Sequence, residues 1–238
     1  VIERLLAKTT IGPLDHVVEI GPGKGHSTAG LIERSGKVSA VELDGRLFEA
    51  LRTKFAGIEK LRLYRGDFMS WQLPAAGAYK VFANIPFSCT TAIIKKLAGC
   101  TNPPREAWLT MEKGAAKRFM GSPRETLGSL MLKPVFELRI VYHFRREDFH
   151  PAPGVDVVLL HLKRKTPPDI TRGQMRAYER FLSCGLGAGC AGLRRILSAK
   201  QLTYALREAN VPRDFTPDEV LYTQWLCLFR CFARVTKL

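Results

Sequence analysis

The segment His16-Val-Val-Glu19-Ile-Gly21-Pro-Gly23-Lys-Gly25 decides the fold, because a short apolar run passes directly into a loop with three glycines. Residues 16–20 have the length and β-branched content of a buried strand, and helical spacing follows the loop. Glycines without side chains let a ligand approach the backbone at such a strand-to-helix junction. The segment therefore predicts the start of a βαβ unit with a ligand site at its turn.

The same alternation of short apolar runs and helical segments continues along the chain. Further strands are expected at 37–42, 61–64, 80–83 and 107–111. Strands that are apolar on both faces are typical of a largely parallel, doubly wound α/β sheet. Two later runs, 139–144 and 155–163, predict an antiparallel pair that closes this sheet.

The character of the chain changes after residue 165, where strand-like runs stop. Helical spacing appears at 174–184, 193–197, 200–209 and 217–232. Thr216, Pro217 and Glu219 predict the N-cap and first turn of the last helix. We expect one domain over residues 1–165 and a small all-helical domain over 166–238.

Composition indicates a polyanionic partner. The 238 residues hold 37 Lys+Arg against 22 Asp+Glu, which gives a formal charge of +15. Such an excess favours nucleic acid, with a merely solvated basic surface as the alternative. No apolar run approaches the roughly 20 residues of a membrane-spanning helix, so no membrane partner is expected. The six cysteines show neither C-x-x-C nor zinc-ligand spacing, so no metal site is expected.

The spacing of the glycines narrows the choice of ligand. Gly21, Gly23 and Gly25 do not match the dinucleotide fingerprint, because His26 stands where its third glycine belongs. The loop also lacks the Ser or Thr and the upstream glycine of a phosphate-binding loop. A loop for S-adenosylmethionine remains, and a tight turn that needs glycines only for conformation fits equally well when the loop is taken alone.

Two carboxylates follow the next strands. Glu42 ends the second strand, where an acid can accept hydrogen bonds from both ribose hydroxyls of a bound nucleoside. Asp67 follows the third strand and could accept from an adenine amino group, although an aspartate beside glycine is equally typical of a capped turn. These acids fit S-adenosylmethionine but do not by themselves exclude a dinucleotide.

The tetrapeptide Asn84-Ile85-Pro86-Phe87 directly follows the fourth strand, in the crevice at the carboxyl ends of the sheet. An exocyclic adenine amine is a poor nucleophile because its lone pair is delocalised, so the site must draw it towards tetrahedral geometry. The Asn84 side-chain oxygen and the Ile85 carbonyl, held extended before proline, can supply two acceptors. Phe87 can stack on a base taken out of its helix.

In order and spacing these motifs resemble those of the rRNA adenine N6-methyltransferases. The resemblance covers nearly the whole chain and includes Glu19–Gly25, Val41–Asp44, Gly66-Asp67, Asn84–Phe87, Glu112–Arg118 and Phe149–Asp156. Asn-Ile-Pro-Phe is similar to the Erm branch, associated with macrolide, lincosamide and streptogramin B resistance. Small-subunit rRNA dimethyltransferases usually carry Asn-Leu-Pro-Tyr at this place.

The resemblance implies a Rossmann-like class I methyltransferase domain, with S-adenosylmethionine as cofactor and a helical C-terminal domain that has a possible RNA-binding role. It implies a catalytic set of Asn84, Ile85, Pro86, Phe87 and Phe149, with Phe149 on the second face of the target base. The implied cofactor set is Glu19, Gly21, Gly23, Gly25, Glu42, Leu43, Asp67, Phe68 and Asn84.

The implied substrate is one adenine in the peptidyl-transferase region of 23S rRNA, modified by a cytoplasmic monomer before or during ribosome assembly. Cations near the expected active-site edge are candidates for phosphate contacts, namely Lys113, Lys117, Arg118, Arg124, Arg145 and Arg146. A 16S-type dimethyltransferase and a non-catalytic nucleic-acid-binding factor on the same fold remain alternatives.

Two departures from the family pattern stand out. Relatives carry a Gln-Asn-Phe stretch ahead of the helix that begins near Val1, and because valine is no natural initiator we expect the sequence to begin inside a longer chain. Val157 stands where the family often has a small or hydroxylated residue.

Overall fold

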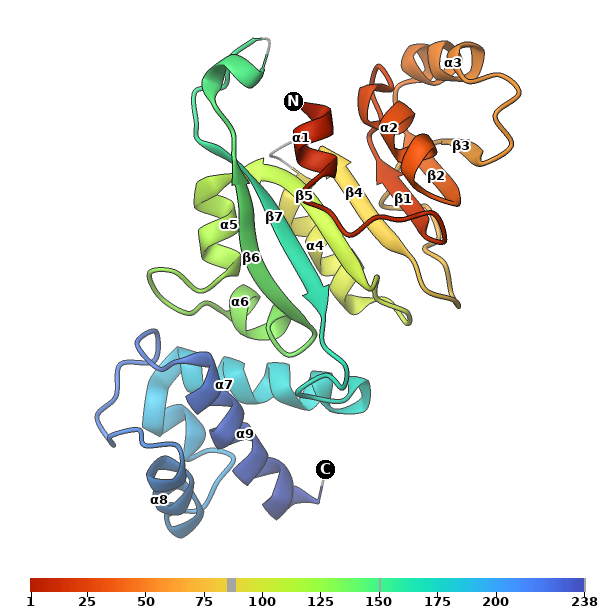
Figure 1. The fold of residues 1–238 in the computed structure, drawn as a ribbon. Coiled ribbons are helices and arrows are strands. Elements are labelled where there is room, and N and C mark those ends of the chain that lie inside the picture. Colours follow the sequence, from red (N-terminus) through yellow and green to blue (C-terminus); the bar gives the residue numbers. More distant parts are fainter. Residues whose placement is uncertain (85–88, 150, 238) are drawn as a thin grey trace. The chain divides into compact units, whose positions relative to one another are not determined.

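One mixed sheet organises the first part of the molecule. The computed structural model describes residues 1–84, 89–149 and 151–237. Over these residues, seven strands follow the order β3-β2-β1-β4-β5-β7-β6 (Figure 1). Their bounds are β1 His16–Ile20, β2 Lys37–Glu42, β3 Leu61–Arg65, β4 Lys80–Asn84, β5 Glu106–Glu112, β6 Phe136–His143 and β7 Val157–Arg164.

Strands β1 to β5 run parallel to one another, and β7 pairs antiparallel with β5. Strand β6 lies beside β7 at the sheet edge. The expected parallel sheet with a closing hairpin is therefore confirmed, and its strand order reverses direction between β1 and β4. In such sheets, ligands bind at the carboxyl ends of the strands beside this switch point.

Helices cover both faces of the sheet, with α1 in front and α4 behind in Figure 1. The helices of the first part are α1 Ile2–Leu6, α2 His26–Arg34, α3 Gly45–Lys54, α4 Thr90–Gly99 and α5 Lys113–Phe119. The apolar strands are buried for this reason, and Val17, Val38, Phe82, Trp108 and Leu159 share one core. This packing holds the loops at the strand ends in place.

A buried polar cluster ties down the amino ends of β4 and β5, opposite the edge where the motifs lie. The Lys80 ammonium donates to the Thr10 carbonyl at 2.6 Å and to the Asp15 carboxylate at 2.9 Å. The His161 Nε2 and Glu106 Oε2 atoms lie 2.7 Å apart. The His161 ring stacks on the Trp108 ring, with 4.9 Å between the ring centroids. Buried charges need such partners, and here they fix the strand that ends at Asn84.

The chain divides into two compact units. Unit 1 comprises residues 1–116 and 137–164, and unit 2 comprises 117–136 and 165–238. Segment 117–136, which the sequence analysis assigned to the first domain, therefore groups with the C-terminal helices. The functional role of each domain stays a prediction.

Unit 2 is helical, as expected, but the helix expected to end at 184 extends to Leu193, no separate helix forms at 193–197, and the last helix begins at Tyr222 rather than 217. Its remaining elements are α6 Leu127–Leu132, η3 Arg172–Gln174, α7 Met175–Leu193, α8 Ala199–Glu208 and α9 Tyr222–Thr236. Residues after Leu193 form a turn rather than a helix. The Glu219 amide donates to the Thr216 carbonyl in another turn, and α9 begins five residues after Pro217.

The mainly aliphatic core of unit 2 contains an aromatic cluster. Phe181 contacts Trp225, Phe229 and Phe232 edge-on or tilted, with ring centroids 5.3 to 6.2 Å apart. Tyr178 packs against Phe229 in the same cluster. This packing holds α7 and α9 together, so the position of surface residues on α9 is well defined within the unit.

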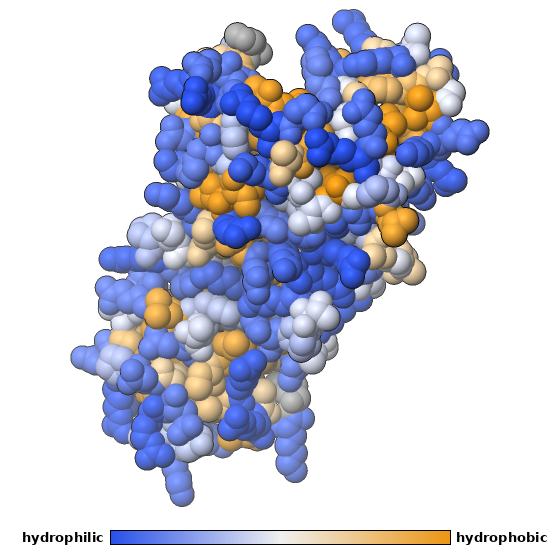
Figure 2. Space-filling view, viewed as in Figure 1, coloured by the Kyte–Doolittle hydropathy of each residue, from blue (hydrophilic) through white to orange (hydrophobic). Residues whose placement is uncertain are grey.

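Hydrophilic residues predominate on the surface seen in Figure 2, where hydrophobic residues gather in small separate patches. Within the described ranges, no helix combines the length and apolar character needed to cross a membrane. In the same ranges, no group of three His, Cys, Asp or Glu side chains is placed to hold a metal ion.

Candidate functional site

The two motifs singled out in the sequence meet at the switch point of the sheet. The glycine loop follows β1, and Asn84 is the last residue of the neighbouring strand β4. A Cβ atom on Gly21 would lie 3.7 Å from the Asn84 carbonyl oxygen, so any side chain at this position would contact the end of β4. Glu42 ends β2 on the other side of β1. The structure thus brings the predicted loop, acid and amide to one edge.

All three loop glycines adopt the left-handed region, with φ of 65° at Gly21, 59° at Gly23 and 75° at Gly25. The Gly21 amide donates to the Val41 carbonyl at 3.0 Å, which joins the loop to β2. The conformational reason for glycine therefore applies at each position. The space around Gly23 and Gly25 differs. A Cβ atom added to Gly23 would have no atom within 4 Å, whereas a Cβ atom added to Gly25 would lie only 2.7 Å from the side chains of Leu51 and Phe55.

This contrast predicts different effects of two matched substitutions. Gly25→Ala is expected to lower the free energy of unfolding by about 2 kcal/mol, because a left-handed alanine and an overpacked core each cost about 1 kcal/mol or more. Gly23→Ala carries only the first cost, about 1 kcal/mol, and places its methyl group in the open space in front of the loop. Urea unfolding of both variants measures the difference. Equal losses would show that Gly25 is not a packing residue.

Glu42 braces the glycine loop. Its side chain is almost fully buried, and its Oε2 accepts from the Gly23 amide at 2.9 Å. Its Oε1 accepts from the Asp44 amide, also at 2.9 Å. A carboxylate has about four acceptor positions, so both oxygens retain capacity for ribose hydroxyls. The next side chain, Leu43, is 69% exposed, which leaves an apolar surface beside the acid on which a nucleoside base can pack.

Glu19 lies beneath the loop with an unusual environment. It is 1% exposed, and its Oε1 accepts from the Ser27 hydroxyl of α2 at 2.6 Å. Its Oε2 is buried and has no hydrogen-bond partner among the described residues. Burial raises the pKa of Glu19 to about 7, the hydroxyls of Ser27 and Thr28 oppose the rise, and the negative charge of Glu42 adds a smaller increase. This residue titrates near neutral pH.

Asp67 caps a turn in the structure. Its Oδ1 accepts from the Met69 amide at 2.8 Å, and its carbonyl accepts from the Trp71 amide. The neighbouring Phe68 is buried, so its ring supports the turn from inside the fold. The turn-capping alternative is thus realised, and a contact between Asp67 or Phe68 and an adenine ring stays a prediction.

Lys96 of α4 holds this turn, although no motif in the sequence points to this residue. Its ammonium donates to the carbonyl oxygens of Phe68, Met69 and Trp71 at 2.5 to 2.8 Å. It also lies 4.9 Å from the centre of the Phe68 ring, and burial lowers its pKa. Nothing in the local sequence separates this lysine from the others, because its three partners are brought to it by tertiary structure.

Asn84 is exposed at the end of β4 and pairs in register with the buried Thr110 of β5. The predicted catalytic residues Ile85, Pro86 and Phe87 lie outside the described residues. Phe149 follows the short helix η2 Arg146–Asp148 in the loop between β6 and β7. Its ring packs on Phe144 with 5.1 Å between centroids. The catalytic roles of Asn84 and Phe149 stay predictions.

The six candidate RNA-binding cations fall into both units. Unit 1 holds Lys113, Arg145 and Arg146, and unit 2 holds Lys117, Arg118 and Arg124. Three of the six form ion pairs, Lys113 with Asp156 at 3.1 Å, Arg145 with Glu147 at 3.3 Å and Arg124 with Asp218 at 2.5 Å. Lys117, Arg118 and Arg146 are exposed. Phosphate contacts by any of the six remain predictions.

Comparison with known proteins gives a consistent result. The model of the ribosomal RNA adenine dimethylase family matches residues 1–210. An rRNA adenine N-6-methyltransferase of Escherichia coli is 31% identical over 98% of this chain and 91% of its own length. An rRNA adenine N-6-methyltransferase of Lysinibacillus sphaericus is 29% identical over 97% of this chain and 91% of its own length.

Solved structures agree. The crystal structure of the 23S rRNA methyltransferase ErmE matches with a TM-score of 0.85 and 27% identity, over 97% of this chain and 96% of that one. A dimethyladenosine transferase from Plasmodium falciparum shares the fold, with a TM-score of 0.82 and 20% identity over 98% and 95%. The match to ErmE supports the expected placement in the Erm branch. The chain therefore belongs to the ribosomal RNA adenine dimethylase family and is an S-adenosylmethionine-dependent rRNA adenine N6-methyltransferase.

Proposed function

We propose that this protein methylates N6 of one adenine in the peptidyl-transferase region of 23S rRNA, before or during ribosome assembly in the cytoplasm. We further propose that this modification confers resistance to macrolides, lincosamides and streptogramin B. The observation that carries the proposal is the match to ErmE along nearly the full length of both chains. The tetrapeptide that begins at Asn84 supports the same branch.

The edge described above fits the proposed cofactor. Open space in front of Gly23 admits a ligand to the backbone, and the Glu42 carboxylate is oriented by two backbone amides. Exposed Leu43 offers apolar surface beside that acid. When bound, S-adenosylmethionine supplies an electrophilic methyl group on its sulfonium sulfur. Glu42 would hold the ribose, and Leu43 would pack against the base.

Activation of the target amine would fall to Asn84. Its side-chain oxygen accepts a hydrogen bond from the adenine amine, which draws the nitrogen lone pair out of conjugation with the ring. The carbonyl of Ile85 would supply the second acceptor, and Phe87 would stack on the base. The amine proton can leave after nitrogen has gained the methyl group, so the residues need only position the amine.

Methyl transfer to isolated RNA tests this proposal. We expect tritium from labelled S-adenosylmethionine to enter protein-free 23S rRNA and not 16S rRNA or duplex DNA. Primer extension is expected to stop at one adenine of the peptidyl-transferase loop. Label confined to 16S rRNA would contradict the 23S assignment and indicate the small-subunit activity. Susceptibility of a host strain to erythromycin, with and without the gene, tests the resistance role separately.

A further inference from the structure

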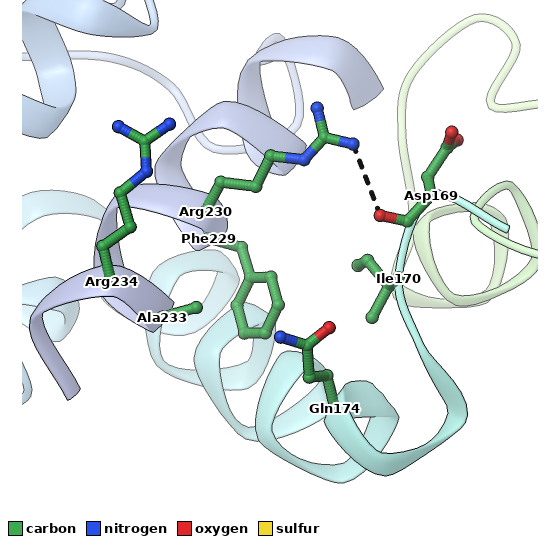
Figure 3. Close-up of a pocket in the computed structure, with 7 residues that line it drawn as sticks. All are labelled: Asp169, Ile170, Gln174, Phe229, Arg230, Ala233 and Arg234. Atoms are coloured by element: carbon green, nitrogen blue, oxygen red, sulfur yellow. Dashed lines mark hydrogen bonds between the residues drawn. The ribbon is translucent and has the colours of Figure 1, made fainter. Parts of the chain in front are cut away.

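A pocket in unit 2 has a lining that suits an anion. Its volume is about 290 Å³, and it opens between the segment at residue 169, the start of α7 and the C-terminal half of α9 (Figure 3). The residues that line it are Asp169, Ile170, Gln174, Phe229, Arg230, Ala233 and Arg234. This volume is at the lower end of small-ligand sites, so the pocket has room for one phosphate-bearing unit but not for a much larger group.

Two guanidinium groups give the pocket its charge. Arg230 and Arg234 stand four residues apart on α9 and therefore lie on one face of the helix. Neither forms an ion pair with any residue of the described part of the chain. Arg230 donates to the Asp169 carbonyl oxygen at 3.4 Å, which fixes its position at the rim. Planar guanidinium groups are well matched to the paired oxygens of a phosphate.

The carboxylate in the lining forms its hydrogen bonds with groups other than the two arginines. The Asp169 carboxylate accepts from the Tyr222 hydroxyl at 2.6 Å and from the Lys165 ammonium. In Figure 3 the carboxylate points away from the two arginines, and the Asp169 backbone carbonyl accepts from Arg230. Burial raises the pKa of Asp169, but the bonds from Lys165 and Tyr222 and the positive charges of Lys165 and Arg230 together outweigh it, so this pKa lies below its ordinary value. The pocket therefore keeps two positive groups and no facing carboxylate from Asp169.

The floor of the pocket is apolar and rigid. Ile170, Phe229 and Ala233 are buried, and Phe229 belongs to the aromatic cluster of the unit. At the rim, the Gln174 side-chain oxygen accepts from the Thr171 hydroxyl at 3.0 Å, so its carboxamide is held in place. A rigid apolar floor with fixed polar groups around it accommodates a sugar beside a phosphate better than a free hydrated ion.

We propose that this pocket binds one sugar–phosphate unit of the rRNA substrate and anchors the RNA on unit 2. The inference rests on the proposed function. Unit 2 carries 16 lysines and arginines against 7 aspartates and glutamates, a formal charge of +9, which favours an RNA polyanion over an isolated small anion. Within this basic surface the pocket is a defined contact, and neutralising it has a larger effect than removing the same charge elsewhere.

The test compares two double variants that each remove two positive charges from unit 2. Arg230→Ala/Arg234→Ala empties the pocket of cations. Arg194→Ala/Arg195→Ala removes two exposed arginines from the turn after α7 and is the matched control. Binding of a 23S peptidyl-transferase-region transcript is measured by filter retention at several salt concentrations. The pocket variant is expected to bind at least tenfold more weakly, with the log–log salt slope reduced by about 1, while the control changes less than threefold.

Steady-state kinetics adds a second readout. The KM for RNA is expected to rise by the same factor as the Kd in the pocket variant, while kcat and the Kd for S-adenosylmethionine stay within about twofold. Thermal unfolding of each variant shows whether it is folded. Because Arg230 also bonds to backbone, Arg234→Ala alone is measured too, and it is expected to account for about half of the loss in binding free energy.

Three outcomes would overturn the inference. The first is an equal loss of RNA affinity in both double variants, and the second is unchanged RNA affinity in a folded pocket variant. The third is that millimolar inorganic phosphate abolishes the difference in affinity between the two variants without displacing RNA from the wild-type protein. If the wild-type protein methylates 16S rather than 23S rRNA, the proposed function fails. The same comparison of variants on 16S rRNA then tests the pocket independently.

Discussion

Replacing Asn84 with alanine is expected to lower kcat for methyl transfer by about 10²- to 10³-fold, whereas the Kd for S-adenosylmethionine changes less than about threefold. This is the loss typical of removing one oriented polar group that acts on developing charge. Asn84 is exposed at the end of β4, and a Cβ atom on Gly21 of the cofactor loop would lie 3.7 Å from its carbonyl oxygen. Because the residue is exposed, we expect its side chain to touch the reacting amine rather than to support the fold.

The matched control is Asn84→Asp, which keeps an acceptor oxygen at nearly the same place. This variant is expected to retain more activity than the alanine variant, because the amine needs an acceptor and not the amide nitrogen. Single-turnover methylation measures the chemical step, and calorimetry measures cofactor binding. Equal losses of cofactor affinity and kcat in Asn84→Ala would show that the residue only supports the loop.

The strands could be predicted because their signal is local. Each of β1, β2 and β4 is a short apolar run that ends in a glycine, acid or amide, and the structure places all three within one residue of the expected bounds. The start of α9 could not be predicted, because Thr216-Pro217 has the local chemistry of a helix start although the helix begins five residues after Pro217. The structure instead caps α9 with Gln224, whose side-chain oxygen accepts from the Leu221 amide at 2.9 Å. The local chemistry of Thr216 serves a turn instead, in which the Glu219 amide donates to the Thr216 carbonyl.

Some residues of the candidate site could also be predicted from the sequence, and the surroundings of others could not. Gly21 and Glu42 were recognisable because their roles follow from position at the carboxyl ends of neighbouring strands. The partners of Glu19 and Lys96 were not, because Ser27 and the three carbonyl groups come from other elements. A buried carboxylate cannot be told from a solvated one by its letter in the sequence. Its altered pKa depends on the burial that the whole fold produces.

The buried carboxyl group of Glu19 is therefore expected to make the protein less stable as pH rises, and one substitution at this residue is expected to remove the effect. Burial raises its pKa from the ordinary 4.5 to about 7 in the folded protein. The folded state then binds more protons than the unfolded state between these values, so the free energy of unfolding falls as pH rises from about 4.5 to 7. Below this window the carboxyl group is neutral in both states, and above it the full cost of the buried charge is present.

The shift corresponds to about 3 kcal/mol at pH 8, from 1.36 kcal/mol for each pKa unit. Glu19→Gln keeps an oxygen to accept from Ser27 and has no charge to bury. The free energy of unfolding of Glu19→Gln minus that of the wild type is expected to be about 2 kcal/mol larger at pH 8 than at pH 5. Urea unfolding of both proteins without cofactor at the two pH values measures this double difference, in which other titrating groups cancel. A double difference near zero would mean that Glu19 is ionised at the same pH in the folded and unfolded chains. The unpartnered oxygen would then have to be solvated, and the loop above it would be open to water rather than closed over a buried carboxyl group.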